Sequence, residues 1–413
     1  MTTPDRRAAL WTTAVGATVF VVVAIWLVPW DPVPGGDLQS LDPRTVFTDA
    51  QIDRAEAYAR QARTWSWSSL AVSLAMVCWL AFGRRGRALF QRLPGPWWVQ
   101  VPLAVAVVEL VLRVVTLPFA VLLRQGRLDE GLTNQSWGAF AVDLVKSEVV
   151  GIVVTSLALV AVVACARRWR RAWPAVAAGA LGVLVLAGSF VYPLVVEPLF
   201  NDFEPLPDGP LRTQIMALAD AEGVQVDDVL VADASRRTTT LNAYVSGFGG
   251  TRRVVVYDNL VDDLPQDQAL SVVAHELAHA RHGDVVTGSV LGAAGAVTGV
   301  GLLALLLAGL GRRRRGGHLA QGGVAVPVVL ALVSLATVAT SPVENAVSRQ
   351  IEIRADVDAL RATDDPEAFK AMQTQLALRS LADPTPPAWS QFWFGSHPTG
   401  LTRMALADRM PSD

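Results

Sequence analysis

The stretch Ser271–Asp284 reads SVVAHELAHARHGD and contains the pattern HELAH at residues 275–279. Residues four apart lie on one face of an α-helix, so His275 and His279 can direct both imidazoles at one metal ion. Zn²⁺ accepts such nitrogen ligands in tetrahedral geometry and leaves room for a water molecule. Glu276 lies one step around the helix, where its carboxylate can act on that water as a general base without binding the metal. The stretch therefore predicts a zinc site on a helix over Gln266–His282.

The alternative is a chance helix with histidines on its surface. The chain has only five histidines, however, and three of them fall within eight residues. The apolar neighbours Val272, Val273 and Leu277 predict that the helix is buried, and a buried His-Glu-His cluster would be hard to satisfy without a metal. His282 lies off the ligand face and is expected at the surface.

A catalytic zinc site needs a third protein ligand. The segment SRQIEIRAD at residues 348–356 predicts a helix on which Glu352 and Asp356 share a face. Glu352 could bind the metal, and Asp356 could accept the outer N–H of a ligating histidine and so fix its tautomer. Alternatively, these acids belong to an exposed charged helix and pair with Arg349 and Arg354.

The composition indicates a membrane protein. Of 413 residues, 52% are hydrophobic and 17% are charged, with a mean hydropathy of +0.37. Soluble domains are about 25% charged, so a purely soluble enzyme is disfavoured. The net charge of −2 gives no basic footprint for nucleic acid. Cys78 and Cys165 lie in apolar runs, which argues against a disulfide framework.

Crossing a bilayer takes roughly 20 apolar residues, and the chain offers seven candidate stretches. They cover about 8–30, 67–82, 98–123, 149–166, 172–196, 285–310 and 324–343. The first resembles a signal peptide in position, but its apolar stretch is long and no small-residue cleavage site follows it. We therefore expect a retained membrane anchor. The second and fourth could instead be buried core helices.

Arginine clusters predict the orientation. They lie at Arg6–Arg7, Arg84–Arg92, Arg167–Arg171 and Arg312–Arg315, which seven spans would place on one side. The positive-inside rule assigns that side, with the amino terminus, to the cytoplasm. The scarcity of lysine hints at a bacterial genome and hence a bacterial plasma membrane. The sixth and seventh spans separate His279 from Glu352, and two crossings return the chain to the face it left.

Two polar segments, about 197–284 and 344–413, remain. The first predicts a helix at 211–222 and strands at 226–231, 243–246 and 253–257, the last two forming a hairpin around Gly247, Gly249 and Gly250. The region after the first span, about 42–63, predicts a polar amphipathic helix.

Glu109 and Arg113 share a helix face within the third span, where they would pair or line a water-filled chamber.

These motifs resemble the M48 family of integral-membrane zinc metalloproteases, and most closely its CAAX prenyl protease, Ste24-type, branch. Besides HELAH and SRQIEIRAD, the similarity rests on DASRRTTTLNAY at 233–244, YDNL at 257–260 and Ser396-His397-Pro398. It includes GLTNQSWGAFAVDLVK at 131–146 and EPLFN at 197–201, and so covers nearly the whole chain.

The resemblance implies a mainly α membrane protein. About seven transmembrane helices would enclose a water-filled chamber, capped by a zincin-like α+β metalloprotease domain with a small β-sheet. The chain would divide into an amino-terminal transmembrane domain of five spans, residues 1–196, and an M48-type zinc peptidase domain, residues 197–413, that includes a transmembrane hairpin at about 285–343.

The resemblance also assigns roles to individual residues. One Zn²⁺ per chain would be bound by His275, His279 and Glu352, with Glu276 as general base and acid. His397 would stabilise the oxyanion or contact the scissile carbonyl. Asp356 and Arg349 would support the ligands from behind. A peptide or membrane-protein substrate would bind as an extended strand along residues Asn242, Ala243 and Tyr244.

Two other functions remain open at this point. A quality-control protease of the HtpX type shares this chemistry but usually has fewer spans. A catalytically silent membrane scaffold with structural zinc would not need Glu276.

Eukaryotic Ste24 relatives present the zinc domain to the cytosol, whereas the arginines here predict the opposite, so the side of the active site stays open. The sequence names neither the substrate, nor its prenylation, nor the oligomeric state.

Overall fold

The computed structural model describes residues 3–36, 38–247, 252–312 and 319–410. Gly249, Gly250 and Arg313–Arg315 lie outside these ranges. Within the described chain, seven helices are long and apolar enough to cross a membrane, which confirms the predicted count. They are α1 (Thr3–Leu27), α2 (Asp49–Phe82), α4 (Trp97–Asp129), α5 (Trp137–Arg168), α6 (Trp173–Val191), α10 (Asp284–Arg312) and α11 (Val326–Thr363).

Several helices run beyond their apolar stretches. The helix expected at about 42–63 is present from Asp49 onward, and it continues without a break into the second span as α2. Thr48 begins it with a capping box to Gln51, and no glycine or proline interrupts it before the membrane. The helix predicted over 348–356 is present, and it belongs to α11, which continues from the seventh span to Thr363. One helix thus joins the apolar span to the segment that carries Glu352.

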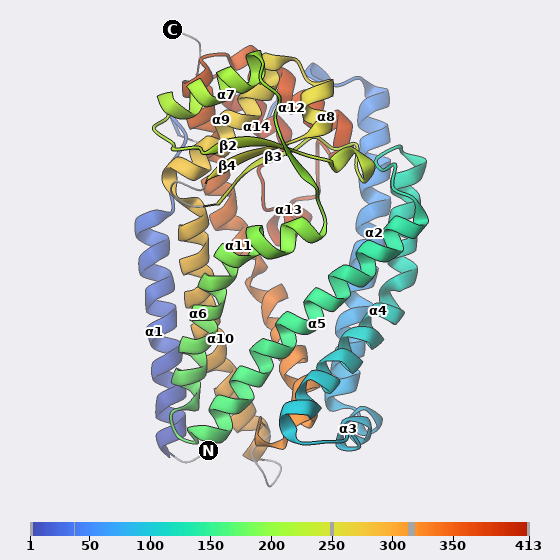
Figure 1. Ribbon diagram of the computed structural model, residues 1–413, viewed down its shortest axis with the longest axis vertical. Coiled ribbons are helices and arrows are strands. Elements are labelled where there is room, and N and C mark those ends of the chain that lie inside the picture. The colour runs from blue at the N-terminus through green and yellow to red at the C-terminus, as the bar shows by residue number, and fades with distance from the viewer. Residues whose placement is uncertain (1–2, 37, 248–251, 313–318, 411–413) are drawn as a thin grey trace.

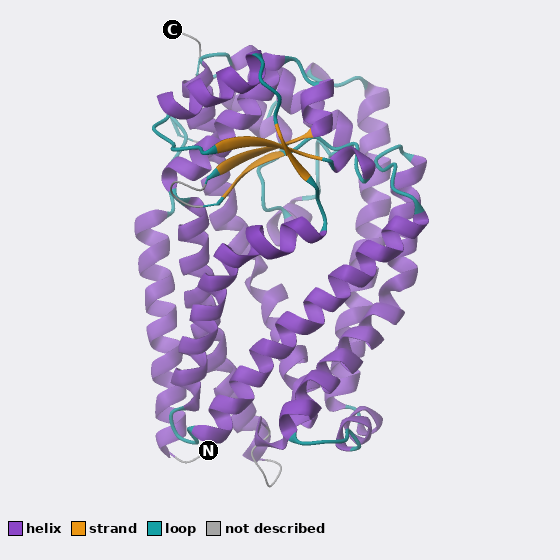
Figure 2. Ribbon diagram, viewed as in Figure 1, coloured by secondary structure: helices purple, strands orange, loops and turns teal. Residues whose placement is uncertain are grey.

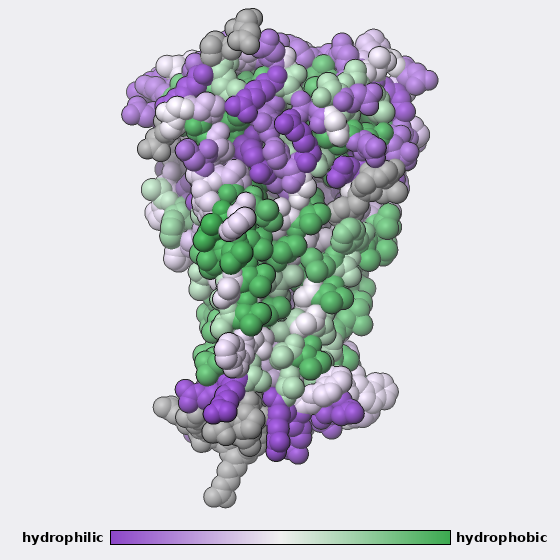
Figure 3. Space-filling view, turned by 90° about the vertical axis from the view of Figure 1, so that its left-hand side faces the viewer, coloured by the Kyte–Doolittle hydropathy of each residue, from purple (hydrophilic) through white to green (hydrophobic). Residues whose placement is uncertain are grey.

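The molecule is elongated, with a small sheet near one end of a helical bundle (Figures 1 and 2). The amino-terminal end of α1, helix α3 (Arg84–Gln91) and the connection from α5 to α6 all lie at the opposite end. The arginines of the first three clusters belong to these segments. Figure 3 shows a broad hydrophobic belt between hydrophilic ends, as expected for a chain that crosses a bilayer.

The sheet of the described chain has the strand order β1-β2-β4-β3. Its strands are β1 (Phe203–Pro205), β2 (Asp228–Ala232), β3 (Ala243–Ser246) and β4 (Arg253–Tyr257). β2 and β4 are parallel, whereas β1–β2 and the predicted pair β3–β4 are antiparallel. β1 was not expected, because its three residues lie in a proline-rich turn and depend on β2 for pairing. β3 forms an edge of the sheet.

Helices surround this sheet at the polar end. They are α7 (Pro210–Ala221), α8 (Asp258–Asp263), α9 (Gln266–His282), α12 (Pro366–Ser380), α13 (Ala388–Phe394) and α14 (Gly400–Ala407). A buried core joins Val254 and Val256 of β4 to Val273 and Leu277 of α9 and to Phe369 of α12. A second core lies among the membrane helices. The apolar side of α9 is therefore fixed against the sheet, which leaves its histidine face free for the site.

A cavity of about 1430 Å³ extends from the polar end into the helical bundle. Its wall is mainly alanine, valine, leucine and glycine from α1, α5, α10 and α11, and it reaches Glu276, His279 and Glu352. Its described lining does not include Glu109 or Arg113.

The pair expected between Glu109 and Arg113 is replaced by an interhelical one. Arg113 Nε lies 2.7 Å from Glu148 Oε2 of α5. The helical spacing within α4 permitted the first pair, but it could not reveal an acid on a neighbouring helix. The bond therefore ties α4 to α5 instead of bridging one turn of α4.

Close packing of α1 on α10 gives a prediction about stability. A Cβ atom on Gly301 would lie 2.6 Å from Thr13 N and 2.9 Å from Ala9 O, both backbone atoms, whereas one on Gly299 would meet nothing within 4 Å. We expect Gly301→Ala to destabilise the purified protein by about 1–3 kcal/mol through overpacking. Gly299→Ala, two residues away on the same helix, is the control and should leave the thermal unfolding temperature unchanged or slightly higher. Equal temperatures for both variants would contradict the packing shown.

Candidate metal centre

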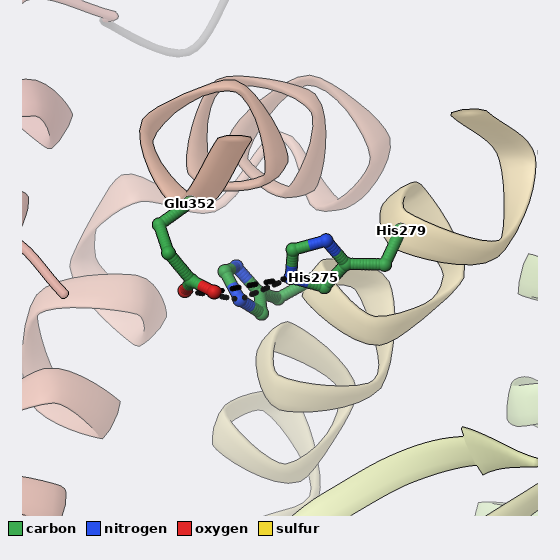
Figure 4. Close-up of side chains that lie close together, drawn as sticks. All are labelled: His275, His279 and Glu352. Atoms are coloured by element: carbon green, nitrogen blue, oxygen red, sulfur yellow. Dashed lines mark hydrogen bonds and ion pairs between the residues drawn. The ribbon is translucent and has the colours of Figure 1, made fainter. Parts of the chain in front are cut away.

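Three side chains from two helices converge at the candidate site (Figure 4). His275 and His279 project from α9 and Glu352 from α11, and one ligand atom of each lies within 4.8 Å of the others. The two Nε2 atoms are 3.2 Å apart. His275 Nε2 is 3.3 Å from Glu352 Oε2, and His279 Nε2 is 3.7 Å from Glu352 Oε1. The structure thus brings together the three residues expected to bind metal.

The inner histidine is held by a buried ion pair. His275 Nδ1 lies 2.9 Å from Asp356 Oδ1, the contact anticipated for this aspartate, and Asp356 is fully buried. Arg403 of α14 binds the same carboxylate through both oxygens, at 2.7 Å from Nε and 2.5 Å from Nη2. A bidentate arginine fixes a carboxylate in orientation as well as in charge. The ring of His275 is therefore locked with Nε2 facing the site.

The outer histidine is held in the same way. His279 Nδ1 lies 2.9 Å from Asp284 Oδ2, and Arg354 pairs with the other oxygen of Asp284. α9 ends at Gly283 with a φ of 65°, a left-handed conformation that glycine adopts without strain. This turn starts α10 immediately and places Asp284 beside the last turn of α9.

Asp284 and Arg403 were not among the predicted site residues. Asp284 follows the zinc motif by five residues, in the HGD that ends the quoted stretch, and that proximity was its only local signal. Arg403 lies 47 residues from its partner Asp356, a separation at which no sequence period applies. The pairing of Arg354 with Glu352 or Asp356 is wrong, since Arg354 bonds Asp284.

Arg349 has a different partner from the one expected. Its guanidinium does not pair with the acids of its own helix in the contacts described. Instead Nη1 donates to Gly395 O at 2.5 Å and to Gln391 O at 3.3 Å. It thereby anchors the segment after α13 that carries His397.

His397 approaches the ligands from that segment. Its Nδ1 lies 2.9 Å from Glu352 Oε2, and its side chain is 60% exposed. Gln391 Nε2 donates to the carbonyl oxygen of His397 at 2.6 Å. The ring therefore touches the ligand carboxylate on one side and remains accessible on the other. His282, by contrast, lies outside the cluster and bonds Asp358, with His282 Nε2 2.6 Å from Asp358 Oδ2.

The charges of the centre favour a cation. Burial disfavours a charged imidazole, but the hydrogen bonds that the ring donates to Asp356 and Glu352 outweigh this effect and raise the pKa of His275 to about 9. Burial, with a contribution from the charge of Glu352, raises the pKa of the Glu276 carboxyl, although His275 and His279 oppose this. A carboxyl group with a raised pKa is suited to accept and return a proton near neutral pH.

The donor set fits a metal ion. Each Nδ1 that faces a carboxylate carries a proton, which directs the Nε2 lone pair of a neutral imidazole into the centre. With the two Nε2 atoms 3.2 Å apart, either a proton or a metal ion must lie between them, because two facing lone pairs repel. The buried Glu352 Oε2 also lacks a well-aligned hydrogen bond. Two nitrogens and a carboxylate are ligands that Zn²⁺ prefers in catalytic sites.

The predicted substrate strand lies beside this centre. Ala243 and Tyr244 are in the edge strand β3, which packs on α9, and Tyr244 lines the same cavity as Glu276. Asn242 precedes the strand, and its side-chain oxygen accepts a hydrogen bond from Ala243 N at 3.0 Å.

Comparison with known proteins places these features in a class of membrane peptidases. The family model "Peptidase family M48" matches residues 205–410, and "CAAX prenyl protease N-terminal, five membrane helices" matches residues 42–202. The chain therefore belongs to peptidase family M48 and is a multi-pass membrane metalloprotease of the Ste24-like, CAAX prenyl protease branch.

Individual relatives share different parts of the chain. The "uncharacterized metalloprotease YhfN" of Bacillus subtilis is 29% identical over 312 residues, which is 74% of this chain and 72% of that protein. A "CAAX prenyl protease 1 homolog" of Oryza sativa is 31% identical over 56% of this chain and 54% of its own length. The crystal structure of S. mikatae Ste24p has a TM-score of 0.77 at 19% identity, and the match covers 97% of this chain and 99% of that one. It shares this fold.

The buried anchor of His275 gives a prediction about metal affinity. Asp356→Asn keeps the shape of the side chain but removes the charge that orients the imidazole. We expect metal affinity to fall roughly 10–100-fold. Asp358→Asn, two residues along α11 and bonded to His282 outside the centre, is the matched control and should bind metal like the wild type. Titration of the purified proteins with Zn²⁺ against a competing chelator measures both. Indistinguishable affinities would remove the role assigned to Asp356.

Proposed function

We propose that this metalloprotease is a zinc-dependent endopeptidase in which His275, His279 and Glu352 bind one Zn²⁺ per chain. The supporting observation is the convergence of the two Nε2 atoms and the Glu352 carboxylate, with each Nδ1 held at 2.9 Å by an aspartate. This arrangement prepares three donors and leaves space toward the cavity. Bound there, Zn²⁺ would lower the pKa of a water molecule and polarise the peptide carbonyl.

Glu276 is the general base in this proposal. It adjoins His275 on α9, lines the cavity and has a raised pKa because of burial. Its carboxylate takes a proton from the attacking water and passes it to the amine that leaves. His397, accessible at the edge of the centre, donates from Nε2 to the oxygen of the scissile carbonyl when its ring is protonated. Arg349 positions His397 by holding the preceding carbonyls.

The substrate would be a peptide or a membrane protein. Among the described residues no strand lies on the outer side of the edge strand β3, so an extended chain can add there as another strand, beside Asn242, Ala243 and Tyr244. The cavity that starts at the centre continues into the bundle with a mainly apolar wall. An apolar segment of substrate can lie in it while the scissile bond reaches Glu276.

The two competing functions are less well supported. A quality-control protease of the HtpX type has the same chemistry, but the match to the five-helix amino-terminal family model favours the Ste24 type. A scaffold with structural zinc requires no base, yet Glu276 lies in the cavity wall beside the ligands.

We further propose a division near residue 196 into an amino-terminal membrane domain of five spans and a peptidase domain of residues 197–413 that includes the α10–α11 hairpin. In a bacterial plasma membrane, the arginine-rich end would face the cytoplasm together with the amino terminus. The metal centre would then face the opposite side, because it lies at the other end of the molecule (Figure 1).

The assignment of the base can be tested by Glu276→Gln. The amide cannot accept the proton, so we expect peptide cleavage to fall roughly 10²–10⁴-fold while one Zn²⁺ per chain is retained. Glu222→Gln is a matched control, because Glu222 contacts the same helix through Arg281 at 2.6 Å, away from the centre. Cleavage is measured with a fluorogenic peptide, and the zinc content of each variant is measured by mass spectrometry. Undiminished cleavage by Glu276→Gln would refute this mechanism.

The orientation can be tested with single cysteines in a background without Cys78 and Cys165. Asp208, which is fully exposed near β1, and Arg170, between α5 and α6, mark opposite ends of the molecule. We expect a membrane-impermeant maleimide to label Asp208→Cys in intact bacterial cells and Arg170→Cys only after permeabilisation. The reverse pattern would show that the metal centre faces the cytoplasm.

A further inference from the structure

The segment Arg237–Asn242 leads directly into β3 but has little regular structure of its own. Its position is set by hydrogen bonds from elements on both sides. Because β3 is an edge strand, the residues that hold this segment also determine where the edge lies relative to the metal centre.

The membrane helices contact the segment from one side. The loop Gly131–Ser136, which joins α4 to α5, lies level with the sheet (Figure 1). The buried Thr133 donates from Oγ1 to Arg237 O at 2.5 Å. Thr239 completes the contact, with its N bonded to Leu132 O at 3.4 Å and its Oγ1 to Gly131 O at 3.1 Å.

This loop is itself firmly anchored. The guanidinium of Arg124, buried at the end of α4, lies 4.8 Å from the ring centre of Trp137 and 4.7 Å from that of Phe140. Arg124 also donates to Gln135, whose Nε2 donates to Asp143 Oδ2 at 2.6 Å. Stacking and charge-assisted bonds of this kind restrict a loop to one conformation.

The sheet contacts the segment from the other side. The buried Asn259 donates from Nδ2 to Thr238 O at 3.2 Å and to Thr240 O at 2.9 Å. Tyr257 N, at the end of β4, donates to Asn242 O at 3.0 Å. The segment is thus hydrogen-bonded to the α4–α5 loop on one side and to Tyr257 and Asn259 on the other.

We propose that the α4–α5 loop positions the substrate-binding edge of β3, with Thr133 as its positioning residue; this inference rests on the proposed function. An added strand forms hydrogen bonds only where its backbone groups meet those of the edge at bonding distance. A shift of β3 would therefore weaken substrate binding. The metal ligands and Glu276 belong to α9 and α11 and would remain in place.

The test is Thr133→Val, which keeps the shape of the side chain and removes its hydroxyl. Losing this buried hydrogen bond should raise KM for a peptide about 3–10-fold, with kcat and zinc content unchanged. Thr133→Ser restores the hydroxyl and should return KM to within about twofold of the wild type. Asn134→Ala, in the same loop but with an exposed side chain, is the control and should behave like the wild type.

Hydrogen–deuterium exchange separates this inference from the proposed function. In Thr133→Val the amides of residues 238–246 should exchange faster, whereas those of α9 should not. An unchanged exchange rate at 238–246, or an unchanged KM, overturns the inference. So does a joint loss of kcat and zinc, because it would mean general damage. If the wild type cleaves no peptide, the proposed endopeptidase fails, while the exchange rates still decide whether the loop holds β3.

Discussion

Two aspartates, the fully buried Asp356 and the partly buried Asp284, determine the geometry on which the centre depends. Asp356 and Asp284 each hold one imidazole by its Nδ1 atom at 2.9 Å, and each is neutralised by an arginine, Arg403 or Arg354. The arrangement directs both Nε2 atoms inward. Removing one partner of such a buried pair leaves an uncompensated charge, which is strongly unfavourable. The rings therefore cannot turn away without a large cost, and the donors are oriented before any metal binds.

The same two aspartates connect the centre to the membrane. Asp284 begins α10 and Asp356 lies on α11, so both arms of the transmembrane hairpin are attached to α9. α11 runs for 38 residues from the bundle to the ligands, which makes the position of Glu352 dependent on how this helix packs in the membrane. Close contact between α1 and α10 at Gly301 fixes the other arm. The metal centre is thus supported by the spans that enclose the cavity beside it.

Local patterns predicted much of this structure, and contacts between distant residues account for what they missed. Helical spacing identified His275 and His279, and alternating or β-branched runs bounded by glycines gave β3 and β4 their observed bounds. Apolar length gave the seven spans. No local pattern could reveal that Arg403 would bond Asp356. Nor could one reveal that Arg349 would donate to the carbonyl oxygens before His397. The ion pair of Arg113 with Glu148, instead of Glu109, was equally hidden. In each case several charged partners were possible, and only the packing of separate helices selects one. The three-residue β1 was missed for the same reason, since it exists only through its pairing with β2.

The edge strand β3 is held by its pairing with β4 and also, through the segment before it, by the α4–α5 loop. β3 is preceded by a segment that bonds the α4–α5 loop, whereas the proposed metal ligands are carried by α9 and by the α10–α11 hairpin. The edge strand and the ligands therefore depend on different membrane helices, and their relative position depends on how those helices pack together. Arg113 and Glu148 link α4 to α5 at 2.7 Å, below the loop that Arg124 anchors. A change in the packing of these two helices would reach the edge strand directly through the loop, whereas it would reach Glu352 only indirectly, through the contact of α4 with α11.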